Sequence, residues 1–148
     1  MPNFPSTFIR LLTSFILGSI IGLERERKAR AAGLRTHILV CTGSCLIMLI
    51  SLYIYELYKD KAPLDPARIA AGVVTGIGFL GAGTIIRSRE GIRGLTTAAS
   101  IWVSSAIGLA VGCGFISAAL IVTLLTFLTL SYLRKVERKV TKDGGERK

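Results

Sequence analysis

Charged residues are scarce and unevenly placed in this sequence of 148 residues. The 19 basic and 9 acidic residues fall mostly into a few clusters and leave long uncharged runs between them. A soluble domain spreads charges over roughly a quarter of its residues, so an ordinary soluble domain is excluded. Half of the residues are hydrophobic (51%) and the mean hydropathy is +0.57. These values indicate a membrane protein.

The usual signs of an enzyme or a nucleic-acid-binding protein are also lacking. There is one histidine, no recognisable nucleophile–base pattern and no soluble segment large enough for an active site, so we expect neither enzymatic activity nor a bound cofactor. The net charge of +10 could indicate nucleic-acid binding, but no binding motif accompanies it. Cys41, Cys45 and Cys113 lie in or beside apolar segments, unlike a disulfide framework.

The uncharged runs predict five transmembrane helices, because a hydrocarbon core of about 30 Å needs about 20 helical residues. The 39 uncharged residues of 95–133 would form a single helix of about 58 Å. We divide them at Gly112 and Gly114, which suit a tight turn. The predicted fold is an all-α polytopic bundle, residues 1–133, followed by a short basic tail, 134–148, with spans at 4–23, 36–58, 69–86, 96–111 and 115–133.

The basic residues predict the orientation, since cytoplasmic loops are enriched in Lys and Arg. Five spans place 15 basic residues, in segments 24–35, 87–94 and 134–148, on one side of the membrane. Four lie on the other side or near it: Arg10, Lys59, Lys61 and Arg68. We therefore expect the N-terminus outside and the C-terminus inside. The first apolar run precedes its basic residues, the reverse of a signal peptide, so we expect an uncleaved span whose Arg10 reaches the interface.

Glycines recur at spacings that favour close helix packing. G-x-x-x-G occurs at Gly18 and Gly22, at 72 and 76, and at 108 and 112, and this spacing lets helices approach in a membrane. The G-x-G-x-x-G of residues 76–81 lies inside a span, where a dinucleotide site is not expected. We predict packing, within the chain or between copies, for nine glycines: Gly18, Gly22, Gly72, Gly76, Gly78, Gly81, Gly83, Gly108 and Gly112.

Two expectations follow for the glycines of the third span. Added bulk at Gly76 or Gly78 is expected to disrupt function by altering helix association. Alternatively, the glycines break this helix and free backbone carbonyls to bind an ion, as in discontinuous transporter helices.

A cluster of charges follows the first span directly. In one interpretation it is a solvated turn that binds anionic lipid. In the other, Glu24 turns inward and pairs with Arg35, Arg87 or Arg93, because a charge at that depth is costly without a partner. The second interpretation predicts that Glu24→Gln abolishes activity while membrane insertion persists. The candidate functional residues are Glu24, Arg25, Arg35, His37, Arg87 and Arg93.

Two further patterns concern single helices. His37, Cys41 and Cys45 share one helical face, and although soft metals favour such ligands, one helix seldom completes a coordination shell, so we predict packing and no metal site. Asp65 and Pro66 are predicted as N-cap and first residue of the third helix, and Thr96 or Thr97 as N-cap of the fourth. Such helix starts could hold a phosphate or a lipid headgroup.

Three stretches resemble the MgtC/SapB family of bacterial inner-membrane proteins in order and spacing: GLERERKARAAGLRTH from Gly22, DPARIAAGVVTGIGFLGAGTIIR from Asp65 and GLTTAASIWVSSAIGLAVGCG from Gly94. The resemblance covers about residues 8–133 and implies an inner-membrane protein linked to growth in low magnesium and to virulence. It also implies regulation of other membrane proteins, including the F-type ATP synthase. Longer relatives add a soluble C-terminal domain, for which residues 134–148 are too short.

Two functions remain open from the sequence. We favour a regulatory protein that acts through helix contacts with itself, as a homo-oligomer, or with a partner in a bilayer with anionic headgroups. The alternative is a transporter or channel for Mg²⁺ or another cation. Mg²⁺ favours carboxylate ligands, and the acidic residues next to the spans lie near the two membrane surfaces and not between them: Glu24, Glu26, Glu56, Asp60 and Asp65.

Overall fold

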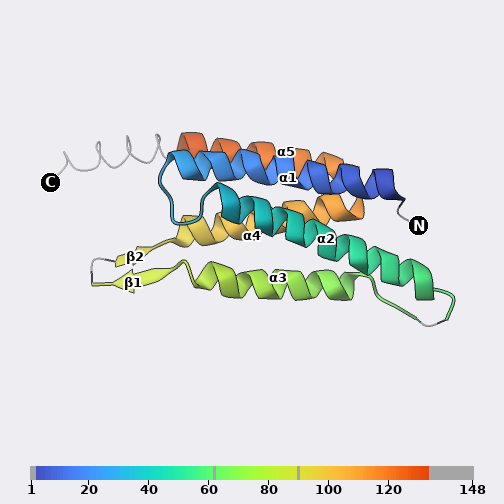
Figure 1. The fold of residues 1–148 in the computed structure, drawn as a ribbon. Coiled ribbons are helices and arrows are strands. Elements are labelled where there is room, and N and C mark those ends of the chain that lie inside the picture. The colour runs from blue at the N-terminus through green and yellow to red at the C-terminus, as the bar shows by residue number, and fades with distance from the viewer. Residues whose placement is uncertain (1–2, 62, 90, 134–148) are drawn as a thin grey trace.

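The computed structural model describes residues 3–61, 63–89 and 91–133, and this part of the chain forms five α-helices (Figure 1). They are α1 (Phe4–Arg27), α2 (Leu34–Tyr58), α3 (Ala67–Ala82), α4 (Leu95–Cys113) and α5 (Ile116–Leu128). A short antiparallel hairpin of β1 (Ile86–Ser88) and β2 (Gly91–Arg93) joins α3 to α4, and a π-helical segment, η1 (Thr129–Leu133), extends α5. The predicted all-α membrane bundle of five helices is confirmed.

Four of these helices are long and apolar enough to cross a membrane: α1, α2, α4 and the continuous helix of α5 and η1. α3 has 16 residues, or about 24 Å, so it is shorter than the hydrocarbon core. The predicted third span, 69–86, was wrong at its end, because the helix stops at Ala82 and Ile86 belongs to β1. The β-branched residues Thr84, Ile85 and Ile86 favour extended backbone at this point.

The loops fall at two opposite ends of the bundle. The α1–α2 loop, the hairpin and the last turn of η1 lie at one end, whereas the N-terminus, the α2–α3 loop and the α4–α5 turn lie at the other (Figure 1). The first end, here called the basic end, carries Arg25, Arg27, Lys28, Arg30, Arg35, Arg87, Arg89 and Arg93. The basic loops thus share one side, as five spans require; the predicted tail, 134–148, lies outside the described residues. A cytoplasmic location of the basic end stays a prediction.

The core lies where α2 packs against α1 on one side and α4 on the other, with Leu17, Cys41, Ile107 and Val111 buried between them. Glycines permit this approach. A Cβ at Gly18 would lie 2.8 Å from the carbonyl oxygen of His37, and one at Gly108 would lie 2.0 Å from that of Cys41. Gly22 faces Leu34 and Gly112 faces Met48 at similarly short range. Two G-x-x-x-G pairs therefore hold α2 between its neighbours by backbone contact.

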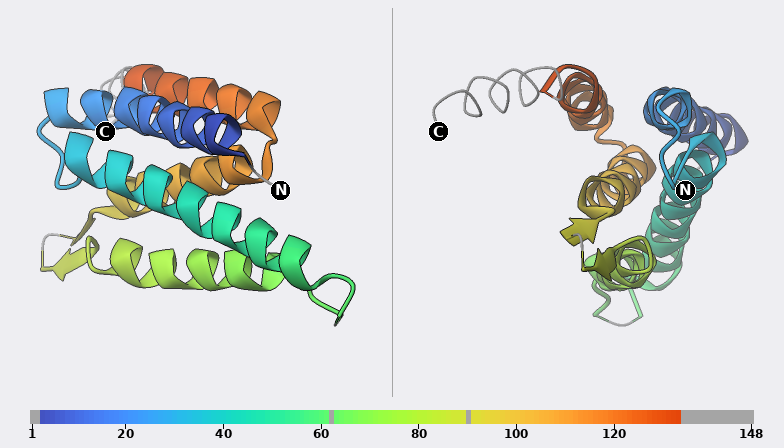
Figure 2. Two further views of the ribbon diagram at one scale, coloured as in Figure 1. Left: turned by 45° about the vertical axis from the view of Figure 1, so that its right-hand side comes forward. Right: turned by 90° about the vertical axis from the view of Figure 1, so that its left-hand side faces the viewer.

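The remaining helix, α3, lies at one edge of the bundle. It sits beside α2 and α4, on the side away from α1 and α5 (Figure 2). It runs without interruption from Ala67 to Ala82 through all of its glycines. The alternative that these glycines break the helix and expose carbonyls was therefore wrong, because a glycine weakens a helix by only about 1 kcal/mol and does not remove its hydrogen bonds.

The helix starts differ from those predicted. Pro66 is the N-cap residue of α3, one position later than expected, although Asp65 Oδ1 still accepts a hydrogen bond from the Ala67 amide at 2.8 Å. Gly94 is the N-cap of α4, and Thr96 and Thr97 lie inside its first turn, so their prediction as caps was wrong. Gly94 has φ 93°, and a Cβ there would lie 1.9 Å from the Thr84 carbonyl oxygen. Only glycine fits this position.

The α4–α5 turn follows the prediction. α4 ends at Cys113, and Gly114 adopts φ 91° as its C-cap. Arg10 of α1 donates a hydrogen bond from Nη1 to the carbonyl oxygen of Gly112 at 2.7 Å. The arginine thereby places a positive charge at the negative end of the α4 dipole, a contact that the sequence did not reveal.

The glycine contacts predict that replacing a glycine by alanine changes the free energy of unfolding at some positions and not at others. Gly108→Ala should lower the free energy of unfolding by about 2 kcal/mol, because its methyl group must displace backbone in a filled core. Gly72→Ala is the matched control, since no described atom lies within 4 Å of its Cβ position; it should be neutral or stabilise by up to about 1 kcal/mol. SDS titration of the two purified variants in detergent measures the difference. Equal stabilities would rule out the proposed role of Gly108.

Candidate functional site

A charged cluster is buried where α1 ends. The side chains of Glu24 and Arg25 expose only 4% and 3% of their surface. Arg25 Nη1 lies 3.9 Å from Glu24 Oε2, and Lys28 Nζ forms an ion pair with Glu24 Oε1. Glu24 therefore turns inward. Its ion partners are Arg25 and Lys28, however, in place of the three arginines that we predicted, because the i,i+4 spacing already places Lys28 against it.

This cluster ties α1 to the rest of the basic end. Arg25 Nη2 donates to Thr97 Oγ1 in the first turn of α4 at 3.2 Å. Lys28 Nζ donates to the Leu130 carbonyl oxygen in η1 at 2.8 Å. Thr97, which we expected to cap its own helix, serves instead as an acceptor for α1. The cluster thus links the end of α1 to both α4 and η1.

The other predicted residues separate into two groups. His37 is fully buried between α2 and α4, where Nδ1 lies 2.8 Å from the Gly33 carbonyl oxygen and Nε2 lies 3.1 Å from Ser100 Oγ. Arg35, Arg87 and Arg93 are exposed, the first at the start of α2 and the other two on the hairpin. Lys28 was missed, although its i,i+4 spacing from Glu24 was visible in the sequence. Arg10 and its acceptor, 102 residues apart, left no such signal.

The structure divides the predicted packing glycines. Gly18, Gly22, Gly108 and Gly112 pack within the chain as described above, and a Cβ at Gly81 would lie 3.6 Å from Ala98 Cβ. Gly83 meets only its own helix. No described atom lies within 4 Å of a Cβ placed at the remaining three, which therefore do not pack within this chain: Gly72, Gly76 and Gly78. α3 contacts its neighbours by other faces.

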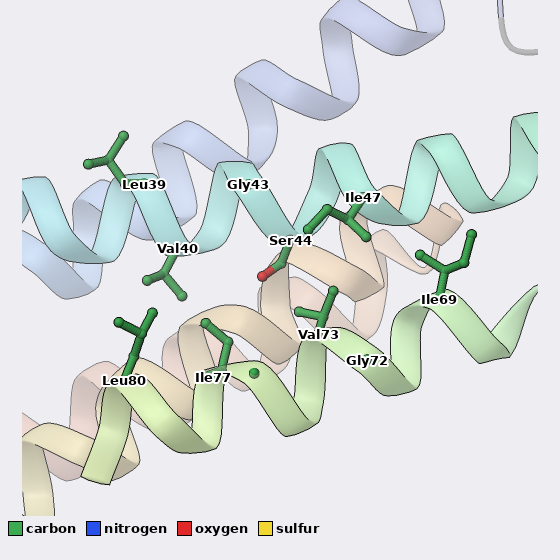
Figure 3. Close-up of a pocket in the computed structure, with 11 residues that line it drawn as sticks. Leu39, Val40, Gly43, Ser44, Ile47, Ile69, Gly72, Val73, Ile77 and Leu80 are labelled. Carbon is green, nitrogen blue, oxygen red and sulfur yellow. The ribbon is translucent and has the colours of Figure 1, made fainter. Parts of the chain in front are cut away.

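Two of these open glycines line a groove between α2 and α3 (Figure 3). The groove has a volume of about 530 Å³. Gly43 of α2 faces it from the opposite wall and likewise meets no described atom within 4 Å of a Cβ position. Except for Ser44, the walls carry only aliphatic side chains and glycines: Leu39, Val40, Gly43, Ile47, Ile69, Gly72, Val73, Gly76, Ile77 and Leu80. We call this feature the α2–α3 groove.

No three His, Cys, Asp or Glu side chains come together as a metal-binding group anywhere in residues 3–61, 63–89 and 91–133. Cys41 and Cys45 are buried in the core beside α1 and α4. Their shared helical face is a packing surface in this structure.

The buried cluster predicts unequal roles for two neighbouring carboxylates. Glu24→Gln should insert into the membrane but lose about 3 kcal/mol of unfolding free energy, because a neutral amide then replaces the buried carboxylate that pairs with Arg25 and Lys28. Glu26→Gln is the control: Glu26 is exposed, and a glutamine oxygen can still accept the 2.9 Å hydrogen bond from the Leu34 amide. SDS titration of protein recovered from membranes tests this. Equal losses in the two variants would argue against a special role for Glu24.

The chain is similar to several known bacterial proteins. The model of the MgtC family matches residues 11–139. The chain is 45% identical over 130 residues to the "Putative magnesium transporter YhiD" of Escherichia coli K12, covering 86% of this chain and 60% of that protein. It is 41% identical over 132 residues to "Protein MgtC" of Salmonella typhimurium, covering 89% of this chain and 54% of that protein. An uncharacterized protein of Haemophilus influenzae is 38% identical to it over 151 residues, covering 99% of this chain and 63% of that protein.

The chain thus spans less than two thirds of the length of each of these relatives. No solved structure matches it. The matched region includes α2 to η1 and all but the first turns of α1, so both the charged cluster and the α2–α3 groove lie inside it. The resemblance seen in the sequence is confirmed, and this chain belongs to the MgtC family.

Proposed function

We propose that this chain is a regulatory protein of the inner membrane that receives a transmembrane helix of another membrane protein in the α2–α3 groove. A connection to magnesium is supported by the name of the Escherichia coli relative. Family resemblance suggests the membrane subunits of the F-type ATP synthase as candidate partners, and growth in low magnesium or in a host as the setting. The basic end faces the cytoplasm in this proposal, in accord with its eight basic residues.

The observation that carries this proposal is the open glycine face of α3. Lipid tails are as apolar as leucine, so helices in a membrane associate through close packing at small residues. Gly18, Gly22, Gly108 and Gly112 are already covered by helices of this chain. Gly43, Gly72 and Gly76 offer the same kind of surface on both walls of a groove, with nothing in contact. A second helix is the occupant that such a surface accommodates best.

The acidic residues support regulation over transport. Glu24 is paired with Arg25 and Lys28 at the basic end, and Glu56 is paired with Lys59 at 2.7 Å at the opposite end. These carboxylates are thus compensated by cations of the chain itself. A Mg²⁺ pathway would need oxygen ligands to replace part of the hydration shell, and the five described helices carry no carboxylate between these two ends of the bundle.

The position of the groove predicts that a larger side chain disrupts partner association at one glycine of α3 and not at another. Gly76→Leu fills the groove and should abolish partner association. From the sequence alone we expected the same of Gly78, but Gly78 lies outside the groove although it is equally open, so Gly78→Leu is now the control. Association is measured by photo-crosslinking in native membranes, from Leu80 inside the groove and from Phe79 outside it. We expect helix crosslinks from Leu80 only, lost in Gly76→Leu and kept in Gly78→Leu. Equal crosslinks from Leu80 and Phe79 would reject the proposal that the groove binds a partner helix.

A flux measurement tests the competing function directly. The purified chain is reconstituted in liposomes that hold a trapped Mg²⁺ indicator, beside empty liposomes and the Glu24→Gln variant. Regulation predicts the same entry of Mg²⁺ as in empty liposomes. Flux above that level, and its loss in Glu24→Gln, would overturn the regulatory proposal in favour of transport.

A further inference from the structure

We propose that the basic end binds one anionic phospholipid, with its phosphate in a cavity beside the first turn of α4 and an acyl chain in a groove between α4 and α5. This site is separate from the α2–α3 groove and does not depend on the function proposed above. It rests on two adjoining cavities with different linings, one basic and one apolar.

The first cavity, here called the basic pocket, has a volume of about 470 Å³. Three cationic side chains from the end of α1 and the loop after it line one wall: Arg25, Lys28 and Arg30. The first turn of α4 and the end of η1 line the others. No acidic side chain is found among the described residues of this lining.

The sequence around the basic pocket is rich in cations, because segments 24–35 and 87–94 hold eight basic and three acidic residues. Arg25 and Lys28 both form ion pairs with Glu24. Arg30 adds a further positive charge, and its Nε is buried with no hydrogen-bond partner in the described structure. A buried donor without an acceptor costs free energy, and a phosphate oxygen is a strong acceptor for a guanidinium group. The pocket therefore favours an anion that brings several oxygens.

The start of α4 adds to this preference. Gly94 caps the helix without a side-chain hydrogen bond to its first turn, so the amides there lack the carboxylate or hydroxyl that usually meets them. α4 has 19 residues, and the positive end of its dipole lies in the pocket wall. A phosphate beside such a helix start is stabilised by both effects.

The second cavity indicates that the anion carries an acyl chain. A groove of about 300 Å³ lies between α4 and α5, and it shares three lining residues with the basic pocket: Thr96, Leu130 and Thr129. The groove follows one face of α4 to Val103, about 10 Å from Thr96 along the helix. Leu125 on its other wall is 57% exposed on the bundle surface. A hydrocarbon chain can thus enter the groove from the bilayer.

A phospholipid satisfies both cavities, whereas inorganic phosphate fills only the first. Basic pockets between transmembrane helices on the cytoplasmic side are suited to anionic headgroups, because that leaflet is negatively charged. The basic end is the side that we predict to be cytoplasmic. Each basic residue in such a site contributes about a fivefold gain in affinity.

The test is native mass spectrometry of the full chain in detergent, titrated with phosphatidylglycerol or with phosphatidylcholine of the same acyl chains. The wild type should bind the first molecule of phosphatidylglycerol at least tenfold more tightly than the first molecule of phosphatidylcholine. Arg30→Gln should reduce this preference about fivefold. Arg89→Gln is the matched control, because it removes the same charge from an exposed hairpin position outside the pocket. Arg30 is only partly buried, so its replacement should leave the fold intact.

Two further arms separate the lipid from free phosphate. Ala99→Leu narrows the apolar groove and should weaken phosphatidylglycerol binding several-fold, while inorganic phosphate at millimolar concentration should not displace the lipid. Equal binding of the two lipids by the wild type would overturn the proposal, as would equal effects of Arg30→Gln and Arg89→Gln. If inorganic phosphate displaced the lipid and Ala99→Leu had no effect, the ligand would be a soluble anion and the acyl groove would be rejected.

Discussion

The structure depends on backbone contact between α2 and its two neighbours. Cys41 lies at the centre of this contact: a Cβ on Gly18 would lie 2.9 Å from its Cβ, and a Cβ on Gly108 would lie 2.0 Å from its carbonyl oxygen. Because van der Waals packing replaces the hydrophobic effect as the force between helices in a bilayer, this close fit sets how far apart α1, α2 and α4 lie. It also leaves α3 at the edge of the bundle, where no described atom lies within 4 Å of a Cβ placed at Gly72, Gly76 or Gly78.

Buried charge at the basic end follows from the same arrangement. Once α1 lies against α2 and α4, its last turn carries Glu24 and Arg25 below the loop surface, and both need partners there. Lys28 supplies one from the next turn, and Thr97 of α4 supplies another. With eight basic residues against three acidic ones in segments 24–35 and 87–94, this end has excess positive charge. That excess is the basis of the anion-binding pocket beside α4.

The two proposed binding surfaces have different chemistry and different locations. The α2–α3 groove is apolar and lies along the membrane-crossing part of the bundle, so it suits another helix. The basic pocket lies at the end of α1, α4 and η1, so it suits a phosphate group. Arg25 and Lys28 connect the pocket to α1, which itself packs against α2 through Gly18 and Gly22. A lipid at one surface and a helix at the other can therefore bind the same chain at once.

The sequence by itself determined the features that depend on neighbouring residues. The lengths of the apolar runs predicted five helices, the glycines at 112 and 114 predicted the last turn, and the basic clusters predicted which loops share a side. These signals are local, since hydrophobicity, helix length and a left-handed glycine are properties of short segments. The hairpin after α3 was missed because its charged residues, 87–93, indicated only a loop between two spans, although Ile86 and Ile92 were a local sign of extended backbone.

Only the tertiary structure decided which residues meet. G-x-x-x-G shows that two glycines share a helical face, but three such pairs looked alike, and only Gly18 with Gly22 and Gly108 with Gly112 are covered within the chain. The partner of Arg10, the acceptor role of Thr97 and the need for glycine at 94 likewise depend on segments distant in sequence. Spacing fixes a side chain's direction on its own helix, whereas the neighbour it meets is set by the packing of the whole bundle.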